Sequence, residues 1–372
     1  MSDSVIFPAP PDKAKMRIVA IVRDHMSGLL YAVPYLRALR QRWPEAHITL
    51  LGNPYATPIM ENCPYVDDIV PFFVFRQEAG RFPRLTGLWY KLQSWLKLVG
   101  RVDLVVHFRY TGPSSILWAA SWGKPFQVGY SQYRFDSLLD AHLGPEDVEL
   151  GSRQRNALIL EAIGFEEMSP QMELWLQPED KAWSQQFLIE NGWEPDKPLF
   201  VLHPGCHWGC NQWITGRWAQ LGDALIDRYG GTVVITGSDD EEALAAKVVA
   251  AMRHTPINAA GRTTLDQFAA IIDKATLVTA VDTAPTQFCQ ALNKKSVIMM
   301  GAGTVSWNGP LPGEPMIMLQ RFVERPGPPL CDYAAGACNG PQCQSDLERI
   351  TLELVMRSID KLLAAEVTPV NG

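Results

Sequence analysis

Two short turns in the second half of the chain combine residue types that can hold phosphate. Leu202-His203-Pro204-Gly205 leads to Asn211-Gln212-Trp213, and Val281-Asp282-Thr283-Ala284-Pro285 comes later; each turn follows a buried-strand pattern and opens a helix. The first backbone N–H groups of a helix bind anions, and ligands of parallel sheets collect where strands end. Two such turns on one sheet edge can grip a diphosphate without a metal ion, so the pattern indicates a nucleotide-linked substrate.

Length and composition describe an ordinary globular protein. The chain has 372 residues, of which 47% are hydrophobic and 20% are charged, enough for two domains with separate cores. The formal net charge of -7 argues against a surface that coats nucleic acid. No apolar run approaches the roughly eighteen residues of a membrane-spanning helix, and the N-terminal residues lack the regions of a secretion signal. We therefore expect a cytoplasmic protein with no nucleic-acid partner.

The cysteine pattern favours reduced thiols over disulfides or a metal site. Seven cysteines are too few for a disulfide scaffold, and an odd number fits a reducing compartment. They include two loop groups, Cys206 with Cys210 around His207, and Cys331 with Cys338 and Cys343. Neither group has the C-x-x-C pairs of a standard zinc site, so metal binding is the lesser alternative for both. The pair Asp239-Asp240 lacks the Asp-x-Asp spacing of metal-dependent transferases and is expected to be a pair of surface acids.

The first half of the chain alternates strand and helix patterns. Short β-rich apolar runs joined by segments with helical apolar spacing are typical of a parallel sheet. The expected strands cover residues 16–23, 47–53, 69–75, 102–108 and 126–130, and the expected helices cover 29–42, 88–99, 114–122 and 153–164. This half therefore predicts a doubly wound α/β domain.

The alternation restarts near residue 199. Residues 170–198 mix prolines, charges and tryptophans without a strand period, as a connection between domains does. Further strands are expected at 199–203, 232–236, 277–281 and 296–300, with helices at 217–228, 241–252, 265–274 and 285–292. We predict an α/β fold of two Rossmann-like domains facing across a cleft, with boundaries at 1–175 and 176–346. A closing amphipathic helix within 347–372 could pack back on the first domain.

With its motifs in order, the chain resembles glycosyltransferase family 9, the heptosyltransferases of lipopolysaccharide synthesis. In the first half the resemblance rests on Met16-Arg17-Ile18, on Pro34 to Leu39 with Trp43-Pro44, and on Asn62 to Asp67. In the second half it rests on His203-Pro204-Gly205, Trp213, Thr236-Gly237, Ala260 to Leu265 and Asp282-Thr283. Each motif is weak alone, but their shared order is specific. The resemblance implies the glycosyltransferase B fold, with the acceptor on the first domain and the nucleotide sugar on the second.

The resemblance also implies which residues bind the donor. Helix amides stabilise the leaving nucleotide diphosphate in place of a metal ion. A glutamate after Thr236-Gly237 would accept hydrogen bonds from ribose hydroxyls, although acidic residues also suit a helix N-terminus. Asp282 could likewise cap the helix that follows it. The expected donor-binding residues are His203, Gly205, Cys206, His207, Asn211, Glu241 or Glu242, Thr263, Asp282, Thr283, Ala284 and Gln287.

Three positions depart from the family pattern. The aspartate expected as the catalytic base falls on Gly28, the usual phosphate-loop lysine falls on Asn211, and the usual histidine after the second turn falls on Gln287. Loss of the lysine removes a charge-assisted hydrogen bond to phosphate. Asp24 and His25 follow the same strand, and either could take the acceptor's proton. A capping or solvated role is the alternative for both.

Aromatic residues of the first half bear on the acceptor. The tryptophans at 89, 95, 118 and 122 recur at helical spacings, which more often fill a core than stack on sugar rings. The loop over residues 128–142 is polar, aromatic and not periodic, so it is the better candidate. We expect the acceptor to contact Arg109, Tyr130, Tyr133 and Arg134.

These observations predict an inverting, metal-independent glycosyltransferase. It would move a heptose-like or other sugar from a nucleotide diphosphate sugar to a glycan, lipopolysaccharide or natural-product acceptor. A sulfur nucleophile would also suit a missing base, because it needs little deprotonation. The alternative function is a catalytically degenerate member that binds sugar nucleotide or glycan as a regulator or scaffold.

Other classes are less well supported. A sugar-nucleotide epimerase or dehydrogenase would need Gly-x-Gly-x-x-Gly after the first strand, and Arg23 to Gly28 does not supply it. A lipid-linked acceptor would bring the protein to a membrane surface as a peripheral protein. The basic amphipathic patch expected for that association is not obvious in the sequence. The sequence does not specify the oligomeric state.

Overall fold

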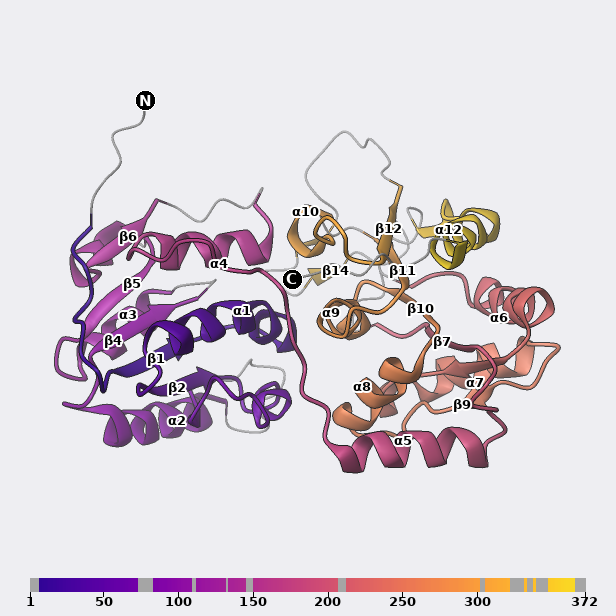
Figure 1. Cartoon of the computed structure of the whole chain (residues 1–372), viewed down its shortest axis with the longest axis horizontal. Coiled ribbons are helices and arrows are strands. Elements are labelled where there is room, and N and C mark those ends of the chain that lie inside the picture. The colour runs from indigo at the N-terminus through magenta and orange to yellow at the C-terminus, as the bar shows by residue number, and fades with distance from the viewer. Residues whose placement is uncertain are drawn as a thin grey trace. The chain divides into compact units, whose positions relative to one another are not determined.

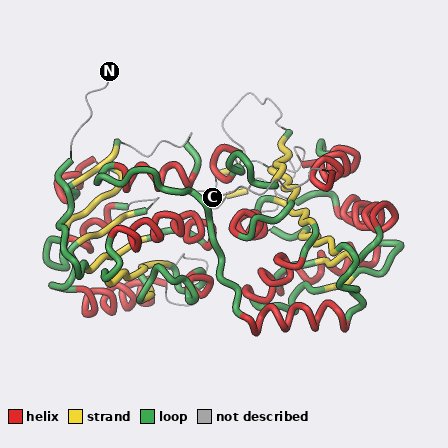
Figure 2. The backbone as a smooth tube through the Cα atoms, viewed as in Figure 1, coloured by secondary structure: helices red, strands yellow, loops and turns green. Residues whose placement is uncertain are grey.

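The computed structural model describes residues 7–72, 83–108, 112–131, 133–144, 150–206, 212–301, 305–321, 331–332, 337–338 and 347–364. The chain divides into two compact units, Met1–Trp175 and Leu176–Gly372. Each unit contains a six-stranded sheet with helices between its strands (Figure 1). Figure 2 shows the same alternation of strand and helix along the backbone. The prediction of an α/β fold with two Rossmann-like domains is confirmed.

The first sheet has the strand order β3-β2-β1-β4-β5-β6, and its strands pair in parallel. Five of its strands were expected, and the sixth was not. The strands are β1 (Arg17–Ile21), β2 (His47–Gly52), β3 (Asp68–Pro71), β4 (Leu104–His107), β5 (Phe126–Tyr130) and β6 (Ala141–Leu143). β6 was missed because three residues are too few to show a period.

Helices of the first unit pack on its sheet through apolar faces. They are α1 (Met26–Arg42), α2 (Pro83–Leu98), α3 (Pro113–Ala120) and α4 (Ser152–Glu161), with short 3₁₀ turns η1 (Thr57–Met60) and η2 (Tyr133–Leu138). One core cluster joins β1 to β4 with the ends of α2 and α3, and Trp122 is fully buried in it. The packing role expected for Trp122 is therefore confirmed, whereas Trp89 is 56% exposed and the same expectation for it is wrong.

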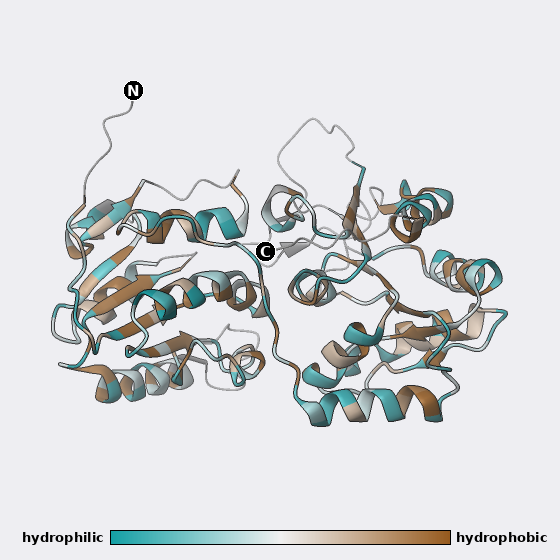
Figure 3. Ribbon diagram, viewed as in Figure 1, coloured by the Kyte–Doolittle hydropathy of each residue, from teal (hydrophilic) through white to brown (hydrophobic). Residues whose placement is uncertain are grey.

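The second sheet has the order β12-β11-β10-β7-β8-β9, again with parallel pairs. Its strands are β7 (Leu199–His203), β8 (Thr232–Ile235), β9 (Ile257–Asn258), β10 (Leu277–Val281), β11 (Ser296–Met300) and β12 (Met316–Gln320). β7, β10 and β11 are buried along their whole length, and Figure 3 shows the hydrophobic colouring of the central strands. A buried continuous run is the pattern of a strand covered on both faces.

The helices of the second unit are α5 (Pro178–Glu190), α6 (Thr215–Tyr229), α7 (Glu242–Ala251) after a 3₁₀ turn η4 (Asp239–Glu241), α8 (Leu265–Lys274), α9 (Ala284–Ala291), α10 (Val305–Asn308) and α12 (Leu352–Ala364). A short hairpin pairs β13 (Cys331–Asp332) with β14 (Ala337–Cys338). None of the described helices is long and apolar enough to cross a membrane.

Two helices also differ from the sequence interpretation. α5 lies where only a connection was expected; Pro178 begins it, acidic residues occupy its first turn, and Phe187 and Leu188 are buried. The final helix packs through Val355 and Ile359 on the core of the second sheet, against β11, β12 and α6. Its described contacts are therefore with the unit that it follows in the chain, whereas the sequence had left open a return to the first domain.

In each sheet the first three strands are added one after another toward one edge. The chain then returns to the other side of the first strand, and the next three strands are added toward the opposite edge. In the first unit this switch point lies between β1 and β4, and in the second it lies between β7 and β10. The connections on either side of such a point leave the sheet in opposite directions, which opens a crevice at the carboxyl ends of the strands. The residues that follow these four strands are therefore the first place to look for a site.

Candidate functional site

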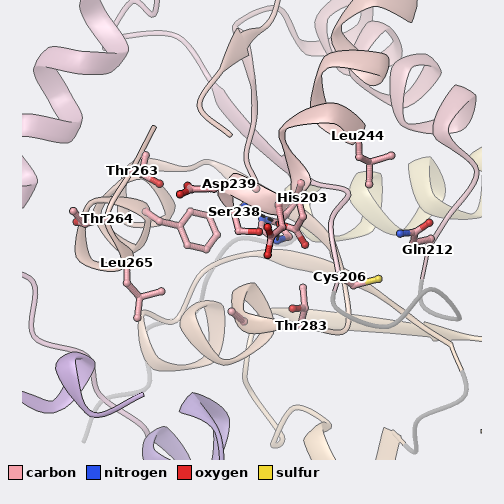
Figure 4. A pocket seen from close by; sticks show the side chains of 15 residues that line it. His203, Cys206, Gln212, Ser238, Asp239, Leu244, Thr263, Thr264, Leu265 and Thr283 are labelled. Atoms are coloured by element: carbon pink, nitrogen blue, oxygen red, sulfur yellow. Dashed lines mark hydrogen bonds and ion pairs between the residues drawn. The ribbon is translucent and has the colours of Figure 1, made fainter. Parts of the chain in front are cut away.

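A cavity of about 520 Å³ lies beside the switch point of the second unit. Its walls come from the segments that follow four strands, β7, β8, β9 and β10. These segments contribute His203 and Cys206, Ser238 to Glu241, Thr263 to Leu265, and Thr283 with Ala284. Figure 4 shows side chains from these separate segments around one space. Its place in the fold is the usual ligand position of an open parallel sheet.

His203, the last residue of β7, is buried and held in one orientation. Its Nδ1 lies 3.0 Å from Thr236 Oγ1, and the Thr236 hydroxyl donates to the Leu202 carbonyl oxygen at 3.3 Å. The threonine oxygen therefore accepts from His203, which assigns the ring proton to Nδ1. Burial lowers the pKa of His203 to about 4, although nearby Glu241 opposes this shift. Nε2 of the neutral ring lies 3.8 Å from Glu241 Oε2. The cavity wall therefore has a hydrogen-bond acceptor next to a carboxylate.

Glu241 and Glu242, the two alternatives for ribose binding, take different places. The Glu241 carboxylate accepts the backbone N–H of Ser238 at 2.7 Å and closes a capping box. A Cβ at Gly205 would collide with this carboxylate, so the glycine makes room for it in the cavity wall. Glu242 lies instead against Gly261, where a Cβ would also collide. Of the two glutamates, Glu241 lines the cavity.

The N-terminus of α9 forms another part of the wall. Thr283 is the N-cap residue and Ala284 the first helical residue, and both line the cavity. The partial positive charge of a helix N-terminus favours an anion at this position. The structure thus brings the second predicted turn to the same cavity as the first.

Asp282 lies between β10 and this helix, and it supports the turn instead of capping it. Its backbone N–H donates to the Met299 carbonyl oxygen at 3.0 Å, and Asn308 Nδ2 lies 3.4 Å from each of its carboxylate oxygens. Burial raises the pKa of Asp282 to about 6, and the Asn308 hydrogen bond works against this rise. The capping alternative is wrong, because Thr283 holds the N-cap position.

The cavity has an acidic side. Asp239 and Asp240, which were expected to be surface acids, join Glu241 in its wall. Among the described lining residues there is no lysine or arginine. Carboxylates repel phosphate but accept hydrogen bonds from hydroxyl groups. The charges therefore suit a nucleotide whose ribose meets the acidic side and whose diphosphate meets the α9 N-terminus.

Several lining residues were not expected from the sequence. Gln212, Ser238, Leu244, Leu265 and Phe268 all face the cavity. Ser238 could have been predicted from the sequence, because the spacing Ser-x-x-Glu to Glu241 is the signature of a capping box. The Phe268 ring centroid lies 5.3 Å from that of His203, and with the leucines it adds apolar surface of the kind that contacts a nucleobase.

Only some of the remaining donor-binding candidates line the cavity. Cys206 and Thr263 line the cavity. Gln287 is buried within α9, with 4% of its surface exposed, and is not among the lining residues. His207 and Asn211 lie outside the described residues.

At the switch point of the first unit, Asp24 follows β1 and packs on the first turn of α1. Asp24 is 8% exposed, and its Oδ1 accepts the backbone N–H of His25 at 2.8 Å. A Cβ built on Gly28 would lie 2.6 Å from Asp24 Cγ and closer still to its other atoms. The Asp24 side chain therefore fills the space that a side chain at position 28 would need. His25 is the exposed N-cap residue of α1.

The acceptor candidates have different surroundings. Tyr130 is 3% exposed, and its hydroxyl donates to the Arg155 carbonyl oxygen at 2.8 Å, so its side chain belongs to the core. Arg134 lies in η2 with its guanidinium 5.5 Å from the Phe135 ring centroid. Tyr133 begins η2, and its side chain is not described. Arg109 lies outside the described residues.

No group of three or more His, Cys, Asp or Glu side chains that could hold a metal ion occurs in the described part of the chain. The backbones of Cys331 and Cys338 pair in the β13–β14 hairpin, while Cys343 and Cys210 lie outside the described residues.

Comparison with known proteins agrees with this fold. A family model described as glycosyltransferase family 9 (heptosyltransferase) matches residues 122–321. Lipooligosaccharide heptosyltransferase 2 of Haemophilus ducreyi is 22% identical over 94% of this chain and 100% of its own length. Among solved structures, a family 9 glycosyl transferase from Veillonella parvula matches with a TM-score of 0.81 at 21% identity, covering 96% of this chain and 99% of that one. The ADP-heptose lipopolysaccharide heptosyltransferase II of E. coli matches with a TM-score of 0.71 at 20% identity, covering 94% and 98%.

Proposed function

We propose that this chain, which belongs to glycosyltransferase family 9, is an inverting enzyme that needs no metal ion and transfers a sugar from a nucleotide diphosphate sugar. Membership of the family makes it a glycosyltransferase of the heptosyltransferase type. The details of donor, acceptor and residue roles are our proposal. One observation carries it: a cavity beside the second switch point combines the N-terminus of α9 with the Glu241 carboxylate.

The ribose and the diphosphate of the donor would bind at different sides of the cavity, because these sides differ in charge. Glu241 accepts the ribose hydroxyls, and the neutral Nε2 of His203 beside it accepts a further hydroxyl hydrogen bond. The amides around Thr283 and Ala284 stabilise the diphosphate as negative charge grows on it during departure. This arrangement lets backbone dipoles do what a metal ion does in other transferases.

Asp24 is the proposed base. Its carboxylate occupies the space beside Gly28, the position onto which the family's aspartate falls. In the reaction, an acceptor hydroxyl gives its proton to Asp24 while its oxygen bonds to the anomeric carbon. The bond from that carbon to the diphosphate breaks on the opposite face, and the electron pair leaves with the nucleotide. The configuration at the anomeric carbon is therefore inverted.

The acceptor is proposed to be a glycan of the lipopolysaccharide type, and the protein is proposed to act in the cytoplasm, where nucleotide sugars are made. The relatives that match are lipopolysaccharide and lipooligosaccharide heptosyltransferases. A natural-product acceptor or a sulfur nucleophile would use the same donor site. Arg134 in η2 is the described cation that we assign to an anionic group of the acceptor.

The proposal is tested by incubating the protein with ADP-, GDP- and UDP-sugars and measuring the thermal shift and the hydrolysis of each. One nucleotide sugar should raise the melting temperature and be hydrolysed slowly, because water replaces the missing acceptor. Transfer to a deacylated lipopolysaccharide core should then be faster, and EDTA should not change its rate. No thermal shift with any donor would favour the scaffold alternative, whereas a shift without hydrolysis or transfer would indicate a degenerate binding protein.

A further inference from the structure

Helix α2 of the first unit carries an apolar stripe that faces solvent. The side chains of Leu85, Leu88, Trp89, Leu92 and Leu96 are 43% to 64% exposed. With 3.6 residues per helical turn, the five positions fall within an arc of about 100°. Nine large hydrophobic side chains of the described residues are exposed, and five of them lie on this helix. Such clustering marks an interaction surface, whereas scattered exposure does not.

The opposite side of α2 already packs inside the unit. Ser94 and Leu98 are buried, and Trp95 packs on the core cluster beneath the helix. Ser94 Oγ also accepts a hydrogen bond from Trp118 Nε1 of α3 at 3.3 Å. The helix therefore has a core face and a second, separate apolar face. The outer stripe is not needed to hold α2 on its sheet.

The sequence around α2 is basic, although the Asp68 carboxylate of β3 lies beside Lys97. Residues 79–102 include five basic residues and no acidic one, although the whole chain has 40 acidic and 33 basic residues. Lys91 and Lys97 lie on opposite sides of the apolar arc. Lys91 Nζ lies 5.9 Å from the Trp118 ring centroid, and Lys97 Nζ lies 2.6 Å from Asp68 Oδ2. An apolar stripe between cations is complementary to a surface with anionic groups above a hydrocarbon layer.

The apolar surface continues beside the helix. α2 packs next to β3, the edge strand of the first sheet (Figure 1). A hollow of about 470 Å³ between them is lined by Ile69, Pro71, Leu96 and Lys97, among others. The hollow joins the stripe to the edge of the sheet.

We propose that α2 is a membrane-interface helix that docks the first unit on a bilayer containing anionic lipid. The leucines and Trp89 enter the boundary between headgroups and acyl chains, and Lys91 and Lys97 stay at the headgroup phosphates. This is the amphipathic patch that the sequence did not make obvious. The proposal does not rest on the sugar-transfer function, because vesicle binding needs no donor or acceptor.

The test is co-sedimentation of the full chain with vesicles of phosphatidylglycerol and phosphatidylcholine in equal parts, and with vesicles of phosphatidylcholine alone. The wild type should bind the anionic vesicles, and added salt should weaken the binding. The double variant Leu88→Gln with Leu92→Gln removes half-exposed side chains and keeps good helix formers, so the fold should survive. Its binding should fall at least about tenfold. The matched control is Ile189→Gln, an aliphatic side chain of α5 that is 45% exposed and should change nothing.

Light scattering without vesicles separates this proposal from its competitors. A wild type that self-associates, with a double variant that does not, would show that the stripe binds a second copy and would overturn the proposal. Failure of the wild type to bind anionic vesicles, or equal binding by the double variant, would overturn it as well. Thermal shift with nucleotide sugar should be the same in all three proteins, so loss of vesicle binding can be read apart from the donor site.

Discussion

The two units share one topology but use their switch points differently. A strand beside each switch point ends in a buried histidine, His107 on β4 and His203 on β7, and burial lowers the pKa of both to about 4. His107 Nε2 lies 2.9 Å from Gln127 Oε1 inside the first unit, whereas His203 Nε2 lies beside Glu241 at the cavity. The same residue type thus contributes to packing in one sheet and to a cavity wall in the other.

A carboxylate placed over a glycine occurs at both switch points. Asp24 covers Gly28 in the first unit, and Glu241 covers Gly205 in the second. In the second unit the glycine and the glutamate come from loops after different strands, whereas in the first they are four residues apart on one strand-to-helix turn. The comparison shows that at both switch points a glycine leaves room for a neighbouring carboxylate, whether the two residues are close in the chain or far apart.

The largest expected effect tests the first switch point. Asp24→Asn keeps the size of the side chain and the oxygen that accepts from His25, but it removes the carboxylate proposed as the base. We expect kcat to fall roughly a hundredfold to ten-thousandfold, the usual contribution of general base catalysis, with donor affinity unchanged. His25→Gln is the matched control at the exposed neighbouring position and should keep its turnover. Full activity in the Asp24 variant would remove the proposed base.

The next effect tests whether the acid can be moved back. Gly28→Asp alone puts a side chain into the space of Asp24 and should lower the free energy of unfolding by about 1–3 kcal/mol, the usual cost of overpacking. Asp24→Gly with Gly28→Asp empties that space and restores the aspartate at the family's position. This double variant should regain stability and at least about tenfold of the turnover lost by Asp24→Gly. A double variant as inactive as Asp24→Gly would contradict the spatial exchange.

A smaller effect is expected at the second switch point. Glu241→Gln keeps the capping box, because glutamine can also accept the Ser238 N–H, and removes only the charge. Donor affinity should weaken about tenfold to a hundredfold, since a hydrogen bond to a charged group contributes about 1.5–3 kcal/mol. The measurement is isothermal titration with the donor that gives the thermal shift. Glu242→Gln, whose side chain lies against Gly261, should bind as the wild type does.

The sequence was most informative where the candidate site is built from local turns. His203-Pro204-Gly205 and Asp282-Thr283 could be placed at one sheet edge because each follows a buried run and opens a helix, and the structure brings both to the second switch point. The choice between Glu241 and Glu242 could not be made, because it depends on which carboxylate packs over Gly205 and which over Gly261. Those contacts join residues that are far apart in the chain.

Other errors arose because a sequence pattern does not show which parts of the protein pack against a segment. The spacing of apolar residues in α2 predicted an amphipathic helix, but spacing alone cannot say that Leu88 and Leu92 face solvent. β9 has only two residues, and β12 lies in a segment rich in glycine and proline, so neither shows a usable period. α5 was missed although Pro178 and the acids after it mark a helix start.

The smallest expected effect is the pH dependence that the buried histidines impose on stability. The folded pKa of His203, about 4, lies below the ordinary value near 6.5, so folding favours the neutral ring. The contribution of His203 to the free energy of unfolding is complete above about pH 6.5 and is lost as the pH falls toward 4, at about 1.4 kcal/mol per pH unit at most. His203→Asn removes this titration and can still donate to Thr236. Urea unfolding between pH 7 and pH 4 should therefore give a shallower slope for the variant, while His107 keeps part of the slope in both proteins. Equal slopes would mean that His203 is already protonated in the folded protein beside Glu241, and that the neutral acceptor proposed for the donor's hydroxyl does not exist.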